Sequence, residues 1–573
     1  MRCLAMGLLA GVVAMGVAPP LAWGEVPEQF RVWGRRAAEH PYLAAAVVEA
    51  RPVVNVEALP EETERGFIVF SLPLFALVKP DHVPSPEERC RALAARDCPG
   101  QYGPVSFAVF PLREAELSLA VSDLEGPGGS TIAAENLDVR AVRCVRLGPP
   151  DRPEVIPLLI ESLGTTRVSP GRAQQFWITY YIPPDSPPGL YEGQVSIAVD
   201  GAQKLSLPLR IRVNPFVLTE PDVSFYMYHG AESDLQALRR WLVDQRCHGM
   251  NTGMVDPPVT QEGGLQDDAM KRTFDMYKQV GFARPEVRVD FWNRVTSEWL
   301  NTPDQSIGMW GAWFRYYPFT QQLDDRYVRA VRAMDGEARK RGLQLILAVA
   351  DEAGSHAWTI KATQHYNVLI KAEVPDVVRE LTVGGGWASN EPEHDLWKGL
   401  INIWTTNRWL PQLEIVKRDD PQAKIGLYNM AGAGSGAGGL MSARNVFGFF
   451  NWRARADGVA QWVHHHAGTP EHNYAWPAQG PEEGPVPTLR WEAVREGTKD
   501  RRYLATLEAR LAGKQGPAAD EAQEFLTGIA ARIELRTEDY DPISGGRVPA
   551  QQPGAYDAWR DRIADFIEAL PAE

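Results

Sequence analysis

The sequence predicts a multidomain protein with a β part and an α/β part: an N-terminal β-sandwich, a (β/α)8 TIM-type barrel and a C-terminal helical extension. Two observations predict this fold class. Short strand-like runs separated by Pro- and Gly-rich turns continue to about residue 213, which is typical of a sandwich. From residue 223 onward, strand-like runs alternate with segments of helical period, which is typical of a barrel. The expected divisions are a leader and three parts, at residues 1–24, 25–216, 223–511 and 512–573.

Length and charge narrow the possible functions. A chain of 573 residues is long enough for two or three domains, or for one large barrel with an added module. The formal net charge of −14 argues against nucleic acid and anionic membrane surfaces as partners, because both attract concentrated positive charge. The hydrophobic content of 44% argues against disorder as the main character of the chain.

The first 24 residues have the pattern of an export signal. Arg2 supplies positive charge, Leu4 to Ala18 is an uninterrupted run of apolar residues and Gly, and Ala22-Trp23-Gly24 fits a cleavage site. The run is short for a membrane span, and no later stretch reaches the length of one. We therefore expect a secreted or periplasmic chain without membrane insertion.

Export would leave four cysteines in the mature chain. Cys90 and Cys98 flank a short polar loop and could form a disulfide in an oxidising compartment. Cys144 and Cys247 fall in different predicted parts of the chain, and both fit buried free thiols better.

The N-terminal part is expected to be all β. Its clearest hairpin runs out from Tyr191 to Val199, turns at Asp200-Gly201 and returns from Leu205 to Val213. Other strand candidates are residues 66–70, 106–110 and 174–181.

Eight strand candidates follow in the barrel part, and helical segments separate them. The first helix is the best marked, because Ser233 and Gln236 fit a capping box and Gly249 ends the segment. Further helices are expected at residues 321–341, 444–456 and 561–570. The eight strands are expected to end near Tyr228, Val255, Phe291, Ala350, Val383, Trp404, Asn429 and Val463.

The most informative position is the end of the fourth of these strands. The apolar run Leu343 to Ala350 leads directly into Asp351-Glu352. Two neighbouring carboxylates repel each other, so one keeps its proton to higher pH, and this suits a general acid beside an ionised partner. A purely structural alternative is that one acid caps the next helix while the other is solvated.

Polar and aromatic residues follow the other strands, at the end where a barrel carries its active site. Carboxylates, amides and aromatic rings around a cleft are what sugar binding requires. We therefore consider the following as substrate-binding candidates: Tyr228, His229, Asn251, Asp290, Trp292, Asn293, Trp404, Tyr428, Asn429 and Trp462.

A second catalytic acid in the usual place is missing. Many retaining glycosidases on this barrel place one carboxylate after the fourth strand and another after the seventh. Here the seventh strand ends in Tyr428-Asn429-Met430. A two-carboxylate mechanism would need Asp290, or Glu391, Glu393 or Asp395 after the fifth strand. The adjacent pair fits better with a substrate that supplies its own nucleophile.

No metal or cofactor is indicated. In His464-His465-His466, consecutive side chains at a strand end point in alternate directions, and no nearby carboxylate completes a metal site. The Gly-rich stretch from Ala431 to Gly439 lacks the Lys-Ser/Thr of a phosphate-binding loop.

Several of these features together resemble glycoside hydrolase family 123 and its uncharacterised relatives, once grouped as a domain of unknown function (DUF4091). The likeness covers roughly Val53 to Leu511. Two departures are Ala353, where the family commonly has Pro, and the motif Ala475-Trp476-Pro477, so the chain resembles a distant member. The motifs that carry the likeness are Gly189 to Gly193, Val213 to Phe216, Asp351-Glu352, Gly458 to Trp462, Thr488 to Gly497 and Asp500 to Leu504.

The resemblance implies a hydrolase that removes N-acetylgalactosamine with retention. In such enzymes the substrate's acetamido oxygen attacks the anomeric carbon, an exception to the two-carboxylate scheme. The resemblance implies that Asp351 orients the acetamido group and that Glu352 is the general acid and base. The charged segment from Arg490 to Tyr503 is expected to form ion pairs rather than to touch substrate.

Two other readings remain. The chain could be a non-catalytic carbohydrate-binding or scaffold protein on a degenerate barrel, because a fold does not guarantee an activity. It could also be a two-carboxylate glycosidase of other specificity, with a second acid near Glu352.

Overall fold

The structure is a computed structural model, and it describes thirteen segments of the chain. All structural statements below concern these segments. They are residues 27–38, 56–147, 154–230, 232–256, 267–290, 320–349, 357–383, 397–406, 411–431, 437–466, 472–480, 483–535 and 548–570.

The N-terminal part contains two antiparallel sheets, apart from one parallel pair. The first has the order β1-β3-β10-β7-β8 and is formed by β1 (Phe67–Phe70), β3 (Tyr102–Pro111), β10 (Gln174–Tyr181), β7 (Leu137–Leu147) and β8 (Glu154–Glu161). The second has the order β2-β12-β11-β4-β9, with two short strands at its side. Its strands are β2 (Leu93–Asp97), β12 (Ala202–Val213), β11 (Gly189–Val199), β4 (Ala115–Val121), β9 (Thr165–Val168), β5 (Leu124–Glu125) and β6 (Thr131–Ile132).

The expected hairpin is confirmed as β11 and β12. Asp200 and Gly201 both have positive φ, at 48° and 80°, which the tight hairpin turn requires. In β12, Leu207, Leu209 and Ile211 are buried while the residues between them are exposed. This alternation gives the strand one apolar face, which packs inward.

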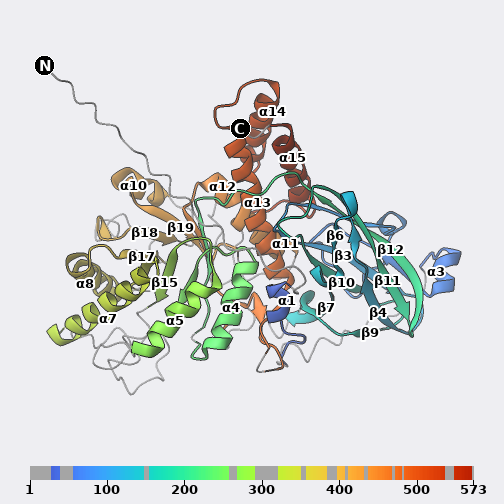
Figure 1. Ribbon diagram of the computed structural model, residues 1–573, viewed down its shortest axis with the longest axis horizontal. Coiled ribbons are helices and arrows are strands. Elements are labelled where there is room, and N and C mark those ends of the chain that lie inside the picture. Colours follow the sequence, from blue (N-terminus) through green and yellow to red (C-terminus); the bar gives the residue numbers. More distant parts are fainter. Residues whose placement is uncertain are drawn as a thin grey trace.

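One hydrophobic cluster takes side chains from both sheets. Phe107 and Ile178 enter it from the first sheet, and Tyr191 and Ile211 enter it from the second. The two sheets therefore share a core. In Figure 1 they lie together at one end of the molecule, drawn in blue to green.

The second part is an eight-stranded, all-parallel sheet that is nearly closed into a barrel. Each strand ends within two residues of its expected position. The fourth, for example, ends at residue 348 instead of 350. The N–H groups of Asn251 and Thr252 donate to the Phe225 carbonyl and so link the first strand to the second (3.2 and 3.3 Å). In chain order the strands are β13 (Ser224–Met227), β14 (Gly253–Val255), β15 (Glu286–Asp290), β16 (Gln344–Ala348), β17 (Val378–Val383), β18 (Ile403–Thr406), β19 (Lys424–Tyr428) and β20 (Gly458–Gln461).

Helices connect these strands. The first is capped by Asp234, whose carboxylate accepts from the Gln236 N–H (2.8 Å), and not by Ser233 as expected. The helix expected at 444–456 begins earlier, at Ala437, and runs through a π-helical segment at 446–450. The barrel helices are α4 (Leu235–Cys247), α5 (Asp267–Val280), α7 (Gln321–Lys340), α8 (Ala357–Glu373), α10 (Pro411–Asp419), α11 (Ala437–Asn445) and α12 (Asn451–Ala454).

Three helices follow the barrel, and the first of them lies between the barrel and the two sheets (Figure 1). They are α13 (Leu489–Leu511), α14 (Pro517–Ala531) and α15 (Ala555–Ala569). Short elements elsewhere are α1 (Glu28–Val32), α3 (Pro60–Arg65), β21 (Ala475–Trp476), β22 (Val486–Pro487) and 3-10 turns at 86–88, 127–129 and 134–136. Within the described segments, no helix combines the length and the apolar character that a membrane span needs.

A buried polar network joins these parts, and Asp244 of α4 is its centre. This carboxylate is fully buried and contacts four donors: the indole N–H of Trp33 (2.6 Å), that of Trp491 (2.8 Å), His464 Nε2 (2.8 Å) and His248 Nδ1 (3.1 Å). Burial alone would raise the pKa of Asp244, but the two histidines outweigh it and hold that pKa well below its ordinary value. The barrel, α1 and α13 therefore meet on one ionised group.

The network continues to the first sheet through Glu492 of α13. Its carboxylate contacts His248 Nε2 (3.3 Å), the Trp177 indole N–H of β10 (3.2 Å) and the Arg495 guanidinium. Burial opposes protonation of His248, but the Asp244 and Glu492 carboxylates prevail and raise its pKa. A charged imidazole between two carboxylates thus connects α4 with α13.

The charges of α13 form ion pairs, as expected. Lys499 lies 2.9 Å from Glu496 and also contacts Asp97 of β2. Asp500 accepts from Arg444 of α11 (2.7 Å) and from Arg560 of α15 (2.6 Å). The helix therefore holds the sheets, the barrel and the C-terminal helices together.

All four cysteines of the described segments are free, so the disulfide considered for Cys90 and Cys98 is not formed. The Cys98 sulfur lies against the Tyr503 hydroxyl (3.3 Å) and the Asn214 carboxamide (3.4 Å). Burial raises the pKa of the Cys98 thiol to about 12, which keeps it unreactive. Cys144 and Cys247 are free thiols as expected, with Cys247 fully buried and Cys144 partly so.

The lowered pKa of Asp244 predicts sensitivity to acid. Because its pKa is lower in the folded than in the unfolded state, its contribution to stability is complete above the unfolded value of about 4 and is lost as the pH falls further. We expect the urea midpoint of unfolding to fall between about pH 5 and about pH 3. An Asp244→Asn variant measured over the same range should fall less steeply, and equal slopes would contradict the assignment.

Candidate active site

The carboxyl ends of the eight strands meet at one mouth of the barrel, where barrels of this kind carry their catalytic groups. Tyr228 directly follows β13, Tyr428 ends β19 and Trp462 directly follows β20. The rings of Tyr228 and Tyr428 meet edge to face with centroids 5.4 Å apart, and the Tyr228 hydroxyl lies 3.3 Å from the Thr382 hydroxyl of β17. One hydrophobic cluster contains Tyr428 and has Tyr228 and Trp462 packed against it. The structure therefore brings these three aromatic candidates together.

Asn429 also lies at this mouth, in a constrained conformation. Its φ is 52°, and its carboxamide oxygen accepts from the Gln461 carboxamide of β20. The Gln461 oxygen in turn accepts from the Ala431 N–H (3.2 Å). Gln461, which was not a candidate, thus fixes the chain after β19 against β20.

Trp462 and His229 occupy neighbouring parts of the rim. The Trp462 ring is half-buried between His466 and His472, with ring centroids 5.5 and 5.4 Å away. The two ring nitrogens of His229 lie 2.8 Å from the Gly230 carbonyl oxygen and 3.2 Å from that of Met254. His229 therefore ties the end of β13 to β14.

The remaining rim candidates are described in part or not at all. Asp290 is the last residue of β15, and its backbone pairs with Ala348 of β16. Trp292, Asn293, Asp351 and Glu352 lie outside the described residues.

Two candidates are not at this mouth. Asn251 precedes β14 and is buried; its carboxamide accepts from the Phe225 N–H (2.8 Å) and donates to Glu220 (2.6 Å), so it closes the opposite end of the barrel. Trp404 is the second residue of β18 and packs with Trp397 and Val416 in a separate hydrophobic cluster. Expecting Asn251 and Trp404 to face substrate was therefore wrong. Asn251 precedes its strand and lies at the amino end, and Trp404 points toward the helices because side chains alternate between the two faces of a strand.

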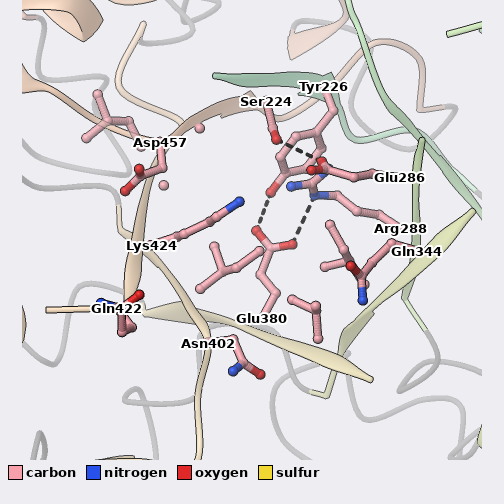
Figure 2. Close-up of a pocket in the computed structure, with 16 residues that line it drawn as sticks. Ser224, Tyr226, Glu286, Arg288, Gln344, Glu380, Asn402, Gln422, Lys424 and Asp457 are labelled. Carbon is pink, nitrogen blue, oxygen red and sulfur yellow. Dashed lines mark hydrogen bonds and ion pairs between the residues drawn. The ribbon is translucent and has the colours of Figure 1, made fainter. Parts of the chain in front are cut away.

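The barrel interior holds a polar layer that the list of candidates did not include. The buried Glu380 carboxylate of β17 accepts from the Tyr226 hydroxyl (2.7 Å), the Thr405 hydroxyl (2.6 Å) and Arg288 Nε (3.0 Å), as Figure 2 shows in part. The Arg288 guanidinium also lies over the Tyr226 ring, 4.0 Å from its centroid. Burial and the Glu380 charge raise the pKa of Tyr226 far above its usual range, so its hydroxyl remains a donor.

The sequence carries a signal for this layer. Residues 286–290 alternate strictly between charged side chains and Val, and Val287 and Val289 are fully buried. In a barrel strand that is covered by helices, the charged positions must then face the interior. The strand could therefore have been read as one with a polar inner face.

A cavity of about 220 Å³ lies below this layer. Figure 2 shows Ser224, Glu286, Gln344 and Lys424 around it, and each is the first residue of its strand. The cavity therefore opens at the amino ends of the strands, where residues serve stability and not catalysis in this fold. We accordingly place the candidate active site at the opposite, carboxyl mouth.

Metal ligands are not gathered in the described part of the chain, where no group of three or more His, Cys, Asp or Glu side chains could hold an ion. Of the three consecutive histidines, His464 is buried against Asp244. Burial lowers the pKa of His464, so it remains a neutral ring within the network.

Comparison with known proteins shows similarity of fold. No protein-family model matches the sequence, and no curated protein matches it. A family 123 glycoside hydrolase from Clostridium perfringens, studied for glycolipid glycan hydrolysis, is 12% identical with a TM-score of 0.61. The match covers 88% of this chain and 97% of that one, so the expected resemblance to this family is confirmed at the level of the fold.

Two further glycoside hydrolases are much less similar. A family 39 enzyme from Bacteroides cellulosilyticus is 12% identical, with a TM-score of 0.36 over 72% of this chain and 82% of that one. A GH5 xyloglucanase from Bacteroides ovatus, in complex with a heptasaccharide, is 8% identical, with a TM-score of 0.29. That match covers 72% of this chain and 99% of the xyloglucanase.

Proposed function

We propose that this protein is a secreted glycoside hydrolase that removes 2-acetamido sugars, of the N-acetylgalactosaminide kind, with retention. The observation that carries the proposal is the barrel mouth. β16 runs toward it and ends at Ala348, three residues before Asp351 in the sequence, and Tyr228, Tyr428 and Trp462 gather on the same rim. The fold similarity to a family 123 enzyme over most of both chains supports the same assignment.

In this proposal the substrate supplies the nucleophile. Its acetamido oxygen attacks the anomeric carbon as the glycosidic bond breaks, and Glu352 donates its proton to the leaving oxygen. Asp351 accepts a hydrogen bond from the acetamido N–H and stabilises the positive charge of the oxazolinium ring. Water then attacks the anomeric carbon, Glu352 takes its proton, and the ring opens to restore the acetamido group.

The stereochemistry of the substrate follows from this route. The acetamido oxygen must approach the face opposite the leaving group, so the two substituents must be trans. Two displacements at the same carbon give net retention. For a galactosamine derivative, the substrate is therefore the β-glycoside.

The other parts of the chain keep supporting roles in the proposal. We interpret the two N-terminal sheets as a β-sandwich within residues 25–216, the barrel as residues 223–511 and the C-terminal helices as residues 512–573. Residues 1–24 are interpreted as the export signal that directs the chain to the periplasm or the medium.

The proposal is tested with two aryl glycosides that share one leaving group. We expect hydrolysis of the aryl N-acetyl-β-galactosaminide, with the β-anomer as the first product seen by NMR, and no hydrolysis of the aryl β-galactoside, which lacks the acetamido group. Equal rates on both would favour a two-carboxylate glycosidase. Glycan binding without any hydrolysis would favour a non-catalytic binding protein.

Trp462 is expected to contribute to substrate binding through its indole face. Trp462→Ala should lower kcat/KM about 2- to 12-fold, mainly through KM, as the loss of one aromatic contact of about 0.5–1.5 kcal/mol predicts. Trp404→Phe is the matched control, because this buried ring packs away from the mouth. Trp404→Phe should lower the unfolding temperature without changing KM, and a KM effect at Trp404 instead of Trp462 would contradict the placement.

A further inference from the structure

A second concave site lies on the other side of the molecule from the barrel mouth. It is a groove of about 720 Å³ between α12, α13 and α14. Its lining includes Asp222 and Asp457, which precede β13 and β20, so it adjoins the amino ends of the strands. The groove therefore shares no residue with the candidate active site, and its volume is in the range of ligand pockets.

Arginines are concentrated in this groove although the whole chain is acidic. Three arginines line it, Arg453, Arg455 and Arg501. Of the three acids in the lining, two are paired with cations outside it. Asp222 lies 2.8 Å from Arg284, and Asp457 lies 3.1 Å from Lys417 and accepts from the Ile425 N–H (2.8 Å). One carboxylate, Glu508, remains opposite three guanidinium groups.

Arg501 of α13 is the most buried of the three. Its side chain is 14% exposed, and Glu508 Oε2 lies 3.7 Å from its Nη1, beyond hydrogen-bond distance. Among the described residues, Nε and Nη1 of Arg501 have no hydrogen-bond partner. Leaving two buried nitrogens of a guanidinium group without acceptors is costly, and a bound anion would supply them.

Trp452 adds an aromatic surface beside these charges. It is half-buried in the groove wall, and its indole N–H donates to Glu508 Oε1 (2.7 Å), which fixes the ring and occupies the remaining carboxylate. Arg453 and Arg455, one and three residues further on, are exposed. An indole next to guanidinium groups offers one surface for the apolar face of a sugar and another for an acidic group.

We propose that this groove binds an acidic oligosaccharide, with a sulfate or carboxylate group held by Arg455 and Arg501 and a sugar ring against Trp452. Guanidinium groups bind such planar or tetrahedral oxyanions through paired N–H donors. Arg453, whose Nε donates to the Ala530 carbonyl (3.3 Å), closes the groove against α14. The site is a binding site only, and it is independent of the proposed hydrolysis.

The test is calorimetric titration of the full mature chain with sulfated N-acetyllactosamine. We expect salt-dependent binding, weakened about tenfold or more by Arg455→Ala and by Arg501→Gln. Arg418→Ala is the matched control, because Arg418 is an exposed arginine of α10 that does not line the groove. The control and a Glu352→Gln variant should bind as the wild type does, which separates this site from the active site.

Three other probes decide the chemistry. Unsulfated N-acetyllactosamine should bind much more weakly, as should sodium sulfate alone and a short poly-glutamate peptide. Absence of binding by the sulfated disaccharide, or unchanged affinity in both arginine variants, would overturn the proposal. Sulfate or the acidic peptide binding as tightly as the sulfated sugar would overturn its glycan specificity. Arg455 is exposed, so its variant keeps the test valid if Arg501→Gln does not fold.

Discussion

Glu352→Gln is expected to lower kcat/KM for an aryl N-acetyl-β-galactosaminide by about 10²- to 10⁴-fold, which is the usual contribution of a general acid and base. The glutamine side chain can neither protonate the leaving oxygen nor accept a proton from water. Asp351→Asn is expected to cause a loss of similar size, because a neutral amide cannot balance the charge of the oxazolinium ring. Both variants should unfold at the wild-type temperature, and initial rates with circular dichroism melting curves measure the two effects.

A carboxylate in the same barrel provides the control. Glu380 is buried and bound to Arg288, Tyr226 and Thr405 below the mouth. Glu380→Gln should keep kcat/KM per folded molecule. It should lower the urea midpoint of unfolding, because the buried Arg288 guanidinium loses the negative charge of Glu380. The reverse pattern, with activity lost in Glu380→Gln and kept in Glu352→Gln, would move the active site to the lower cavity.

The second large effect is expected at Asp244. Asp244→Asn removes the charge that four donors share, the protonated His248 among them, and breaking such a buried arrangement costs about 3–5 kcal/mol. We expect the urea midpoint of unfolding to fall. The barrel and α13 should separate at lower urea than the rest of the chain unfolds, because α1, α4, α13 and the chain after β20 meet at Asp244. Tryptophan fluorescence follows the change directly, because Trp33 and Trp491 donate to this carboxylate.

Asp376→Asn is the matched control for Asp244→Asn. Asp376 is also paired with an arginine, at 3.4 Å, but its side chain is 76% exposed. Exposed pairs contribute about 0–1 kcal/mol, so this variant should unfold close to the wild type. Equal effects at the two positions would show that the buried network does not hold the parts together.

The order of elements could be predicted because each follows from local pattern. Strand ends are marked where apolar runs stop, and the eight barrel strands end within two residues of the expected positions. The Asp200-Gly201 turn fixed the hairpin, since both residues adopt positive φ. The charged residues of α13 were also correctly expected to form ion pairs. They alternate with apolar residues that are buried, so the charged side chains are drawn into the interior and need partners there.

Other features depend on contacts between distant residues and could not be predicted. Asn251 and Trp404 lie near strand ends in the sequence, but only the register of the barrel decides that one closes the amino end and the other faces a helix. The network around Asp244 joins Trp33, His464 and Trp491, which are separated by more than 200 residues from it. No local pattern records that such residues meet.

The proposed site combines both kinds of information. Tyr228, Tyr428 and Trp462 were named from strand ends, and the structure places them together. Asp351 and Glu352 were named from one strand and from a family resemblance, and their roles remain proposals that the variants above test.

The most direct test of the central claim is calorimetric binding of a thiazoline that mimics the cyclised N-acetylgalactosamine intermediate. If the barrel mouth stabilises an oxazolinium ring, the thiazoline should bind the wild type about 10²-fold or more tightly than N-acetylgalactosamine, and Asp351→Asn should abolish that advantage. Equal affinity of the two compounds for the wild type would contradict substrate-assisted hydrolysis by Asp351 and Glu352.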